Sequence, residues 1–304
     1  GPACALSIGN FDGVHRGHRA LLKQLVEGAK ERGLVSCVMT FEPHPKEFFS
    51  PEQAPPRIMN LRDKLAALSN IGIDRVVVEH FNAAFARLSP EEFVSEIIVK
   101  RLNAKWILIG DDFGYGAKRA GNFASLKAAG QQYGFEVSSI QTILEDGERI
   151  SSSALRAALA NGDMKQAEKL LGRPYGISGH VIHGQKLGRT LGFPTLNLAV
   201  ANHLHHRKPA TTGIFTAQVL GLSEKPLPAV ASLGVRPTVE DQGRVLLETH
   251  IFDYQQDVYG KIITVELLEK IRDEAKYDDL DALTNAIAAD AAHARNYFQK
   301  KAYV

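Results

Sequence analysis

The sequence predicts two domains: an α/β domain with a parallel, doubly wound sheet, then a compact, mostly antiparallel β-barrel or sandwich. Up to Gly172, apolar strand-like runs alternate with helical stretches, which is the pattern of a parallel sheet. From Tyr175 on, β-like runs are separated by short glycine-rich turns, which is typical of an antiparallel barrel. A chain of 304 residues has room for two domains. Arg173-Pro174 lies between the two patterns, so we expect domains 1–172 and 173–304.

The composition is that of an ordinary globular protein. Hydrophobic residues make up 44% and charged residues 23% of the chain, and the net charge is +2. This near-zero charge argues against nucleic acid or a membrane surface as partner, and nothing indicates an oligomer. No apolar run is long enough to span a bilayer, and no secretory signal pattern is present. Cys4 and Cys37 lie in apolar runs, so we expect buried thiols and a cytoplasmic protein.

In the first domain, strand-like and helix-like segments follow one another in order. The first strand ends at Gly9, and Leu21, Leu22 and Leu25 then recur at helical spacing. Ser89 followed by Pro and Glu is a helix start signal. The expected strands are 3–8, 34–41, 74–81, 104–110 and 135–142, and the further expected helices are 61–70, 89–102, 123–133, 154–160 and 164–172.

The second domain consists of β-like runs and a C-terminal helix. The runs are 175–200, 213–222, 227–235, 244–254 and 261–271, and the periodic, Ala-rich segment 280–298 is expected to be a closing helix. His203, His205 and His206 lie close together in the sequence, but no carboxylate or cysteine accompanies them. A solvated loop is therefore favoured over a metal site there.

The motif GNFDGVHRGH, residues 9–18, joins the first strand to the first helix. A strand, a glycine turn and a helix in this order present a helix N-terminus to a phosphate. His15 and His18 are spaced so that both imidazoles can reach one anion, and Gly17 between them lets the backbone come close. The alternative is a tight βα turn with two surface histidines.

Three further motifs follow expected strands or open an expected helix. Glu42-Pro43-His44-Pro45 is expected to hold His44 in an extended loop after a strand. The run GDDFGYG, residues 110–116, is a glycine-rich turn after another strand, and 151–153 are serines that cap a helix containing Arg156. These groups suit nucleotidyl transfer to an acceptor that is already an anion, where positioning and charge neutralisation dominate. A proline-rich loop and a merely capped helix are the alternatives.

Taken in order, GNFDGVHRGH, TFEPHP, GDDFGYG and ISSSALR resemble the adenylyltransferase half of the prokaryotic bifunctional FAD synthetases. These enzymes are riboflavin kinase/FMN adenylyltransferases. LGRTLGFPTLN, ASLGVRPT and LLETHIFDYQQDVYGK resemble the riboflavin kinase half, so the resemblance covers essentially the whole chain. It implies a Rossmann-like nucleotidyltransferase domain and a kinase barrel. It also implies riboflavin, FMN and ATP as substrates, Mg²⁺ as cofactor, and FMN and FAD as products.

For the first domain, the resemblance implies that the FMN phosphate attacks the α-phosphorus of ATP. His15, His18 and Arg156 would stabilise the developing charge, and His44 and Asp112 would contact FMN. The family loop usually reads DFrFG, so Gly114 stands where a larger residue is common. The ATP site implied by the resemblance comprises Gly9, Asn10, Phe11, Asp12, His15, Gly17, His18, Asp112, Ser152, Ser153 and Arg156.

For the second domain, the resemblance implies a magnesium site and a general base. Thr195 and Asn197 lie two apart on a strand, so they face the same side, and both offer hard oxygen ligands. Glu248 would take the proton of the riboflavin 5′-hydroxyl, and Arg272 would contact the flavin. Strand alternation alone also allows an outward-facing Glu248. The implied ATP site of the kinase comprises Gly184, Lys186, Gly188, Arg189, Thr195 and Asn197.

Two rival functions remain open at this level. One is an enzyme with a single activity and one degenerate domain, for which the departure at Gly114 makes loss of the N-terminal activity the more plausible direction. The other is a flavin-binding sensor or carrier without turnover. The presence of both PTLN and Glu248 argues against the sensor, because binding alone needs neither a metal pair nor a base.

Overall fold

The computed structural model describes residues 1–110, 112–140, 144–145, 148–182, 192–200, 208–235 and 245–302. The chain divides into two compact units, residues 1–55 with 64–151 and residues 56–63 with 152–304. This division differs from the expected ranges 1–172 and 173–304. Segment 56–63 belongs to the second unit because it is hydrogen-bonded there: the Tyr175 hydroxyl donates to Ile58 O (2.9 Å) and Asn60 Nδ2 donates to Ser178 O (3.0 Å). The helices after Ser151 also belong to that unit.

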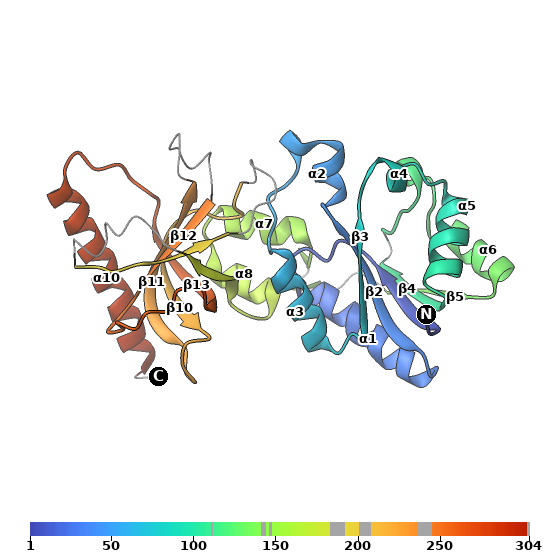
Figure 1. Ribbon diagram of the computed structural model, residues 1–304, viewed down its shortest axis with the longest axis horizontal. Coiled ribbons are helices and arrows are strands. Elements are labelled where there is room, and N and C mark those ends of the chain that lie inside the picture. The colour runs from blue at the N-terminus through green and yellow to red at the C-terminus, as the bar shows by residue number, and fades with distance from the viewer. Residues whose placement is uncertain are drawn as a thin grey trace. The chain divides into compact units, whose positions relative to one another are not determined.

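The first unit contains a parallel sheet of five strands (Figure 1). The strand order is β3-β2-β1-β4-β5, and every pair is parallel. The strands are β1 (Cys4–Ile8), β2 (Val35–Glu42), β3 (Arg75–His80), β4 (Ala104–Gly110) and β5 (Glu136–Ile140). The short pair β6 (Leu144–Glu145) and β7 (Glu148–Arg149), which was not expected from the sequence, forms a separate antiparallel ribbon.

Helices cover both faces of this sheet. One of them is the expected helix 89–102, which is confirmed: it begins with one turn that has a Ser89–Glu92 capping box and continues as a π-helical segment. The helices are α1 (Arg16–Glu31), α2 (Pro45–Phe49), α3 (Leu61–Ile71), α4 (Ala83–Ala86), α5 (Pro90–Glu92), η2 (Phe93–Arg101) and α6 (Phe123–Tyr133), with 3₁₀ turns η1 (Pro51–Gln53) and η3 (Ala117–Arg119).

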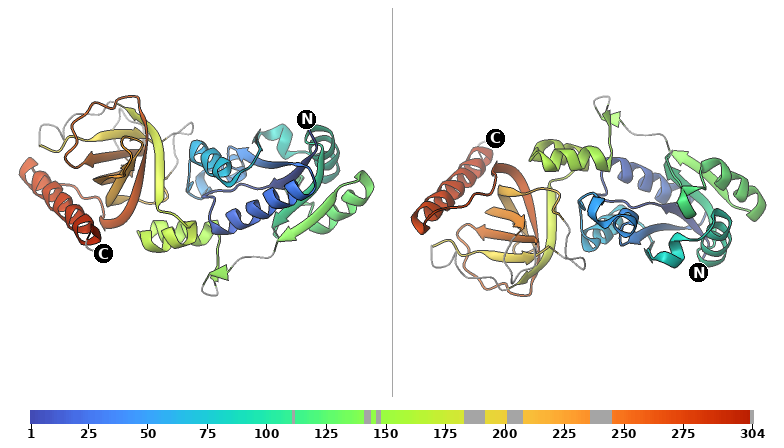
Figure 2. Two further views of the ribbon diagram at one scale, coloured as in Figure 1. Left: turned by 90° about the horizontal axis from the view of Figure 1, so that it is seen from below. Right: turned by 90° about the horizontal axis from the view of Figure 1, so that it is seen from above.

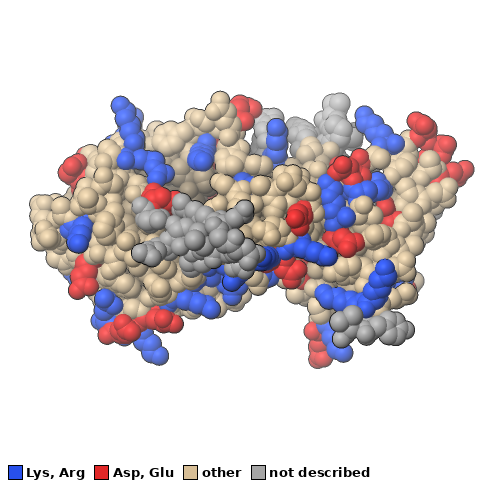
Figure 3. Space-filling model, turned by 180° about the vertical axis from the view of Figure 1, so that it is seen from behind, with Lys and Arg blue, Asp and Glu red and all other residues tan. Residues whose placement is uncertain are grey.

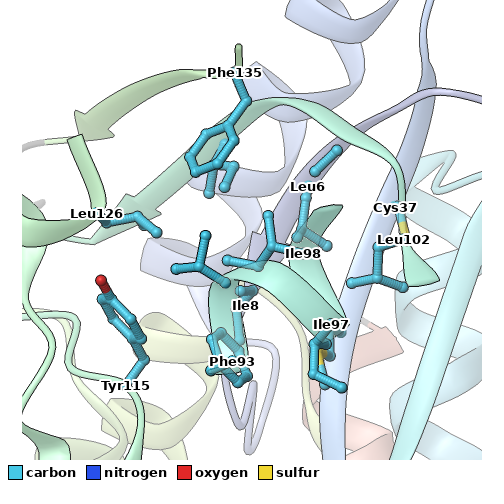
Figure 4. Close-up of a cluster of buried hydrophobic side chains, with 14 of the residues drawn as sticks. Leu6, Ile8, Cys37, Phe93, Ile97, Ile98, Leu102, Tyr115, Leu126 and Phe135 are labelled. Carbon is cyan, nitrogen blue, oxygen red and sulfur yellow. The ribbon is translucent and has the colours of Figure 1, made fainter. Parts of the chain in front are cut away.

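The alternating side chains of β1 divide the core of the first unit into two layers. Cys4, Leu6 and Ile8 pack against η2 and α6 in one apolar cluster (Figure 4). The other face of the sheet is covered by α1, whose Leu22 and Leu25 are fully buried (Figure 2). The central strand is therefore buried on both sides, and the loops at its carboxyl end are anchored on a rigid support.

The second unit is a closed antiparallel barrel with strand order β10-β11-β12-β9-β8-β13, and α10 packs on its outer face (Figures 1 and 2). The expected fold class, including the closing helix, is confirmed. Phe215, Val265 and Leu247, all fully buried, fill the interior. The elements are α7 (Ser152–Ala160), α8 (Met164–Leu171), β8 (Tyr175–Ile182), β9 (Leu196–Ala199), β10 (Gly213–Leu220), β11 (Leu227–Val235), β12 (Val245–Ile251), β13 (Ile262–Arg272) and α10 (Leu280–Ala302).

The surface carries charges of both signs. On the face drawn in Figure 3, lysines and arginines are spread among aspartates and glutamates. Within the described part of the chain, no helix combines the length and the apolar character needed to cross a bilayer.

Candidate active sites

The first candidate site lies where the strand order of the parallel sheet reverses. From β1 the chain continues to β2 and β3 on one side, whereas β4 and β5 lie on its other side. Loops that follow the two strands at such a point separate and leave a crevice in which α/β proteins bind ligands. The loop after β1 carries the HxGH motif, and the loop after β4 carries the GDDFGYG motif. The topology therefore brings these two predicted motifs to adjacent strand ends.

The loop after β1 has a strained backbone. Phe11 and Val14 have φ values of 48° and 40°, in the left-handed region that a β-branched residue such as valine rarely adopts. Both side chains are buried, as is the predicted site residue Asp12. Gly9 N donates to Met39 O on β2 at 3.1 Å, which fixes the start of the loop. Strain of this kind persists only where packing over-determines the conformation, and it concentrates at functional sites.

The two predicted histidines are in contact at the N-terminus of α1. His15 is the N-cap: its Nδ1 accepts from His18 N at 3.2 Å, and the two rings stack with centroids 3.6 Å apart. Because Nδ1 accepts, the neutral imidazole carries its proton on Nε2 and can donate from there. A Cβ on Gly17 would lie 3.1 Å from His15 Cε1 and 3.3 Å from Ile150 O, so this glycine permits the close packing around the ring.

A buried hydrogen-bond chain ties the same loop to β2. Thr40 Oγ1 donates to Asn10 O at 3.1 Å, and Lys64 Nζ lies 3.4 Å from Thr40 Oγ1. Lys64 is only 4% exposed, so a cation is buried directly behind the loop backbone. Sequence reasoning missed Lys64, because a lysine on an amphipathic helix ordinarily lies on its solvated face.

The expectation of an extended loop at His44 was wrong, because the helix α2 begins at Pro45. His44 is its N-cap: Nδ1 accepts from Lys46 N at 3.1 Å, and Glu47 Oε2 accepts from His44 N at 3.0 Å. Proline has no backbone N–H, but the N–H at the first helical position has no partner within the helix. Proline can therefore begin a helix as well as end a strand. His44 is thus held at a fixed position after β2.

An aromatic cluster follows His44 and was also missed from the sequence. Phe48 and Phe49 lie on α2 and make edge contacts with Phe81, with ring centroids 5.5 and 5.6 Å apart. Phe49 is nevertheless 63% exposed. An exposed aromatic ring held against other rings, next to His44, offers a stacking surface for a planar ligand.

The loop after β4 is ordered by aromatic and cationic side chains. The rings of Phe113 and Tyr115 stack with centroids 5.7 Å apart. Asp112 is exposed, and its carbonyl accepts from Arg119 Nη2 at 3.0 Å. Gly114 is the position where the family usually has a larger residue, and the Arg119 guanidinium lies over it. In the sequence, Lys118 and Arg119 directly follow this glycine-rich turn, which indicates a loop suited to a nucleotide.

The predicted residues Ser152, Ser153 and Arg156 lie on α7, in the second unit. Arg156 Nε donates to Pro56 O of the same unit at 2.8 Å. Their part in the ATP site of the first domain stays a prediction.

The second candidate site is a row of polar side chains across three strands of the barrel. Glu248 on β12 is in register with Asn197 on β9 and with Ser232 on β11. Its neighbours Leu247 and Thr249 are fully buried and face the barrel interior, so Glu248 faces outward together with its two partners, which is the orientation given above as the alternative. Asn197 is 6% exposed, and Thr195 immediately precedes β9. The register therefore brings two of the predicted kinase residues side by side.

The end of β13 borders this row. Ser232 Oγ donates to Glu274 Oε1 at 3.4 Å, and Gly234 leaves the space that the Glu274 carboxylate occupies. Arg272 makes a bidentate pair with Asp290 of α10, at 2.9 and 2.7 Å, and lies over the Tyr277 ring. The hydrogen bonds to Asp290 raise the pKa of the Arg272 guanidinium. Its predicted flavin contact stays a prediction.

Some predicted residues lie outside the described residues. These are the loop residue Asp111, the histidines His203, His205 and His206, and the kinase flap residues Gly184, Lys186, Gly188 and Arg189. Within the described part of the chain, no cluster of three or more His, Cys, Asp or Glu side chains suits a metal ion.

Comparison with known proteins also divides the chain into two parts. The family model of FAD synthetase matches residues 2–154, and that of riboflavin kinase matches residues 171–298. The bifunctional riboflavin kinase/FMN adenylyltransferase of Escherichia coli K12 is 48% identical over 97% of this chain and 93% of its own length. The protein of the same description from Haemophilus influenzae is 44% identical over 97% of this chain and 94% of its own length.

A solved structure is also similar over nearly the whole chain. It is described as a macrolide-efflux protein from Streptococcus pneumoniae, with a TM-score of 0.79, 32% identity, and coverage of 97% of this chain and 95% of that chain. The relatives and the two family models span both units and both candidate sites. The chain therefore belongs to the family of bifunctional riboflavin kinase/FMN adenylyltransferases.

Proposed function

We propose that the second unit phosphorylates riboflavin to FMN with ATP, and that the first unit transfers AMP from ATP to FMN, giving FAD and pyrophosphate. The observation that carries this proposal is the presence of two separate sites, one at the reversal point of the parallel sheet and one at Glu248 on the barrel. Each site has the side chains for one phosphoryl chemistry.

In the first unit, the FMN phosphate is itself the nucleophile, so the protein has to orient it and neutralise charge. The backbone of 9–12 and Gly17 bound the ATP pocket, and the Nε2–H of His15 donates to a phosphate oxygen. His18, stacked on His15, supports the same role at the positive end of α1. We assign Asp112 to this reaction as well, and the roles of Ser152, Ser153 and Arg156 in it stay a prediction from the sequence.

The same unit has a place for the isoalloxazine ring system of FMN. His44 is fixed by its capping box, and Phe49 presents an exposed ring five residues later. We assign the flavin ring to the Phe49 surface and the flavin contact to His44. Stacking on aromatic side chains suits a planar, weakly polar ring system.

In the barrel, Glu248 is the general base. Its carboxylate accepts the proton of the riboflavin 5′-hydroxyl as the oxygen attacks the γ-phosphorus, and ADP leaves. Asn197 and Ser232 lie in register with Glu248 on the two neighbouring strands, so the carboxylate has polar side chains on both sides. Arg272 is assigned to the flavin side of the site, and the flap residues Gly184, Lys186, Gly188 and Arg189 to ATP.

The donor set at Thr195 and Asn197 fits Mg²⁺. A hydroxyl and an amide oxygen are hard ligands, and the near-complete burial of Asn197 beside a carboxylate is a polar environment suited to a cation. When bound, Mg²⁺ neutralises charge on the ATP phosphates. Both cysteines are free thiols, and we propose that the protein acts in the cytoplasm, where thiols stay reduced.

The test of this division of labour uses the variant Glu248→Gln. Wild-type protein incubated with riboflavin, ATP and Mg²⁺ is expected to form FMN and then FAD, resolved by chromatography. The variant should lose at least about a hundredfold in riboflavin phosphorylation, because it lacks the base, and should convert added FMN to FAD at the wild-type rate. Loss of both reactions in a folded variant would refute the assignment, and riboflavin left unchanged by wild-type protein would support a flavin sensor.

A further inference from the structure

The loop after β4 is a closed and firmly held hairpin. Tyr115 and Gly121 exchange backbone hydrogen bonds of 3.0 and 2.9 Å, and Ala117 N donates to Leu88 O at 2.7 Å. The Tyr115 hydroxyl is 3.0 Å from Ser125 Oγ, which ties the hairpin to α6. The segment between these anchors is therefore pre-organised.

Two consecutive cations at the tip of this hairpin have a costly backbone conformation. Lys118 and Arg119 have φ values of 54° and 55°, although neither is glycine. Such a conformation is unfavourable for a residue with a side chain and is retained only when the surroundings enforce it. The effect of this conformation is to turn the Arg119 side chain back over the beginning of the loop, where its Nη2 donates to Asp112 O.

The space that Arg119 occupies exists because residue 114 is glycine. A Cβ on Gly114 would lie 3.0 Å from Arg119 Nε, 3.1 Å from Nη2 and 3.3 Å from Cζ. An alanine at this position would force the guanidinium to move, and a larger side chain would displace it. The positions of Gly114 and Arg119 thus depend on each other. Glycine at position 114, where the family usually has a larger residue, leaves the space that the Arg119 guanidinium occupies.

We propose that Arg119 is a substrate-binding residue of the adenylyltransferase reaction and binds a phosphate group of FMN or ATP. The hairpin follows β4 beside the reversal point, and both substrates are phosphate anions. Among the described residues, the guanidinium makes one hydrogen bond, to Asp112 O, and its other N–H groups can bind phosphate oxygens in fork geometry. This proposal rests on the proposed function of the first unit.

The test compares the full-length variants Arg119→Ala and Lys118→Ala with wild-type protein. The measurement is the steady-state rate of FAD formation from FMN and ATP, with each KM and kcat determined separately. Arg119→Ala should raise one KM or lower kcat about tenfold or more, since a hydrogen bond to a charged group is lost. A rise in the KM for FMN assigns the FMN phosphate, and a rise in the KM for ATP assigns the triphosphate. Lys118→Ala, with the same backbone strain and exposure, should stay within twofold.

Two further variants separate substrate binding from a structural role. Gly114→Ala keeps the Arg119 guanidinium but displaces it. This variant should therefore raise the KM that Arg119→Ala raises, by a smaller factor. The double variant Gly114→Arg with Arg119→Ala returns a guanidinium to the loop and should recover part of the loss. Arg119→Ala kinetics within twofold of wild type, or an equal effect of Lys118→Ala, would overturn the proposal. Failure of wild-type protein to form FAD would instead refute the proposed function itself.

Discussion

In our proposal His15 combines two tasks in one side chain, because its two ring nitrogens have different functions. Nδ1 accepts from His18 N and so caps α1, and Nε2 is the nitrogen to which we assign the phosphate contact. The strained residues Phe11 and Val14 set the direction from which the chain enters this cap. The proposed role in catalysis needs a histidine here, whereas the N-cap by itself accepts other residues.

This separation predicts different effects for two substitutions of His15. His15→Asn keeps a side-chain acceptor at the N-cap, and His15→Ala removes it. Both should slow FAD formation from FMN by about tenfold or more, since both lose the Nε2 donor. Only the alanine variant should lose about 1 kcal/mol in the free energy of unfolding, measured by urea denaturation. Wild-type FAD synthesis by His15→Asn would contradict the proposed role. Riboflavin phosphorylation serves as the control, because it belongs to the second unit.

At the scale of elements, α10 is attached to the barrel by apolar contacts and by ion pairs, of which the pair between Arg272 and Asp290 is the least exposed. Ala291 and Ala294 pack against Val230 of β11 and Phe252. The carboxylate of Asp290 is 6% exposed and is paired with Arg272 at the end of β13. Two charged hydrogen bonds in fork geometry fix the helix at the level of the strand end, beside the loop that carries Glu274.

Removal of one partner of this pair should destabilise the second unit. Asp290→Ala leaves a guanidinium half buried without its carboxylate, and we expect a loss of about 2–4 kcal/mol in the free energy of unfolding. The double variant Arg272→Met with Asp290→Leu should lose less, because no unpaired charge remains. Thermal or urea unfolding of both variants measures the difference. Equal stability of Asp290→Ala and wild-type protein would show that the pair contributes nothing.

At the scale of the whole molecule, two reactions in sequence are distributed over two units. The product of the kinase reaction, FMN, is the substrate of the adenylyltransferase reaction. Each candidate site is built from strands of its own sheet, the parallel sheet or the barrel. We expect free diffusion of FMN between the sites to be sufficient for FAD synthesis.

Free diffusion predicts complementation between two defective variants. Over a short incubation, Glu248→Gln alone should leave riboflavin unchanged, and His15→Asn alone should accumulate FMN with little FAD. A mixture of the two should form FAD from riboflavin after a lag, because FMN released by one variant reaches the intact site of the other. Accumulation of FMN without FAD in the mixture, although Glu248→Gln converts added FMN, would contradict free diffusion.

Local pattern was sufficient for most of the fold. Alternation of apolar runs and turn residues predicted the strands β1 to β5 and the barrel strands, and the motif at 9–18 placed two histidines at a helix N-terminus. The helix at Pro45 was missed because proline signals both the end of a strand and the start of a helix. Lys64 was missed because its burial depends on a contact with Thr40, which is 24 residues away in the chain. Arg119 follows the glycine-rich turn in the sequence, but its contact with Asp112 O is a result of the fold of the loop.

The sequence by itself determined the order of the elements, the two-part organisation and the loops that carry the chemistry, since these depend on residues close together in the chain. Only the tertiary structure decided which face of β12 carries Glu248 and which residues flank it. Strand alternation allows both faces, and the choice is made by register with β9 and β11 and by the closure of the barrel. The attachment of 56–63 to the barrel and the use of the space at Gly114 by Arg119 were likewise decided by tertiary contacts, which local sequence does not encode.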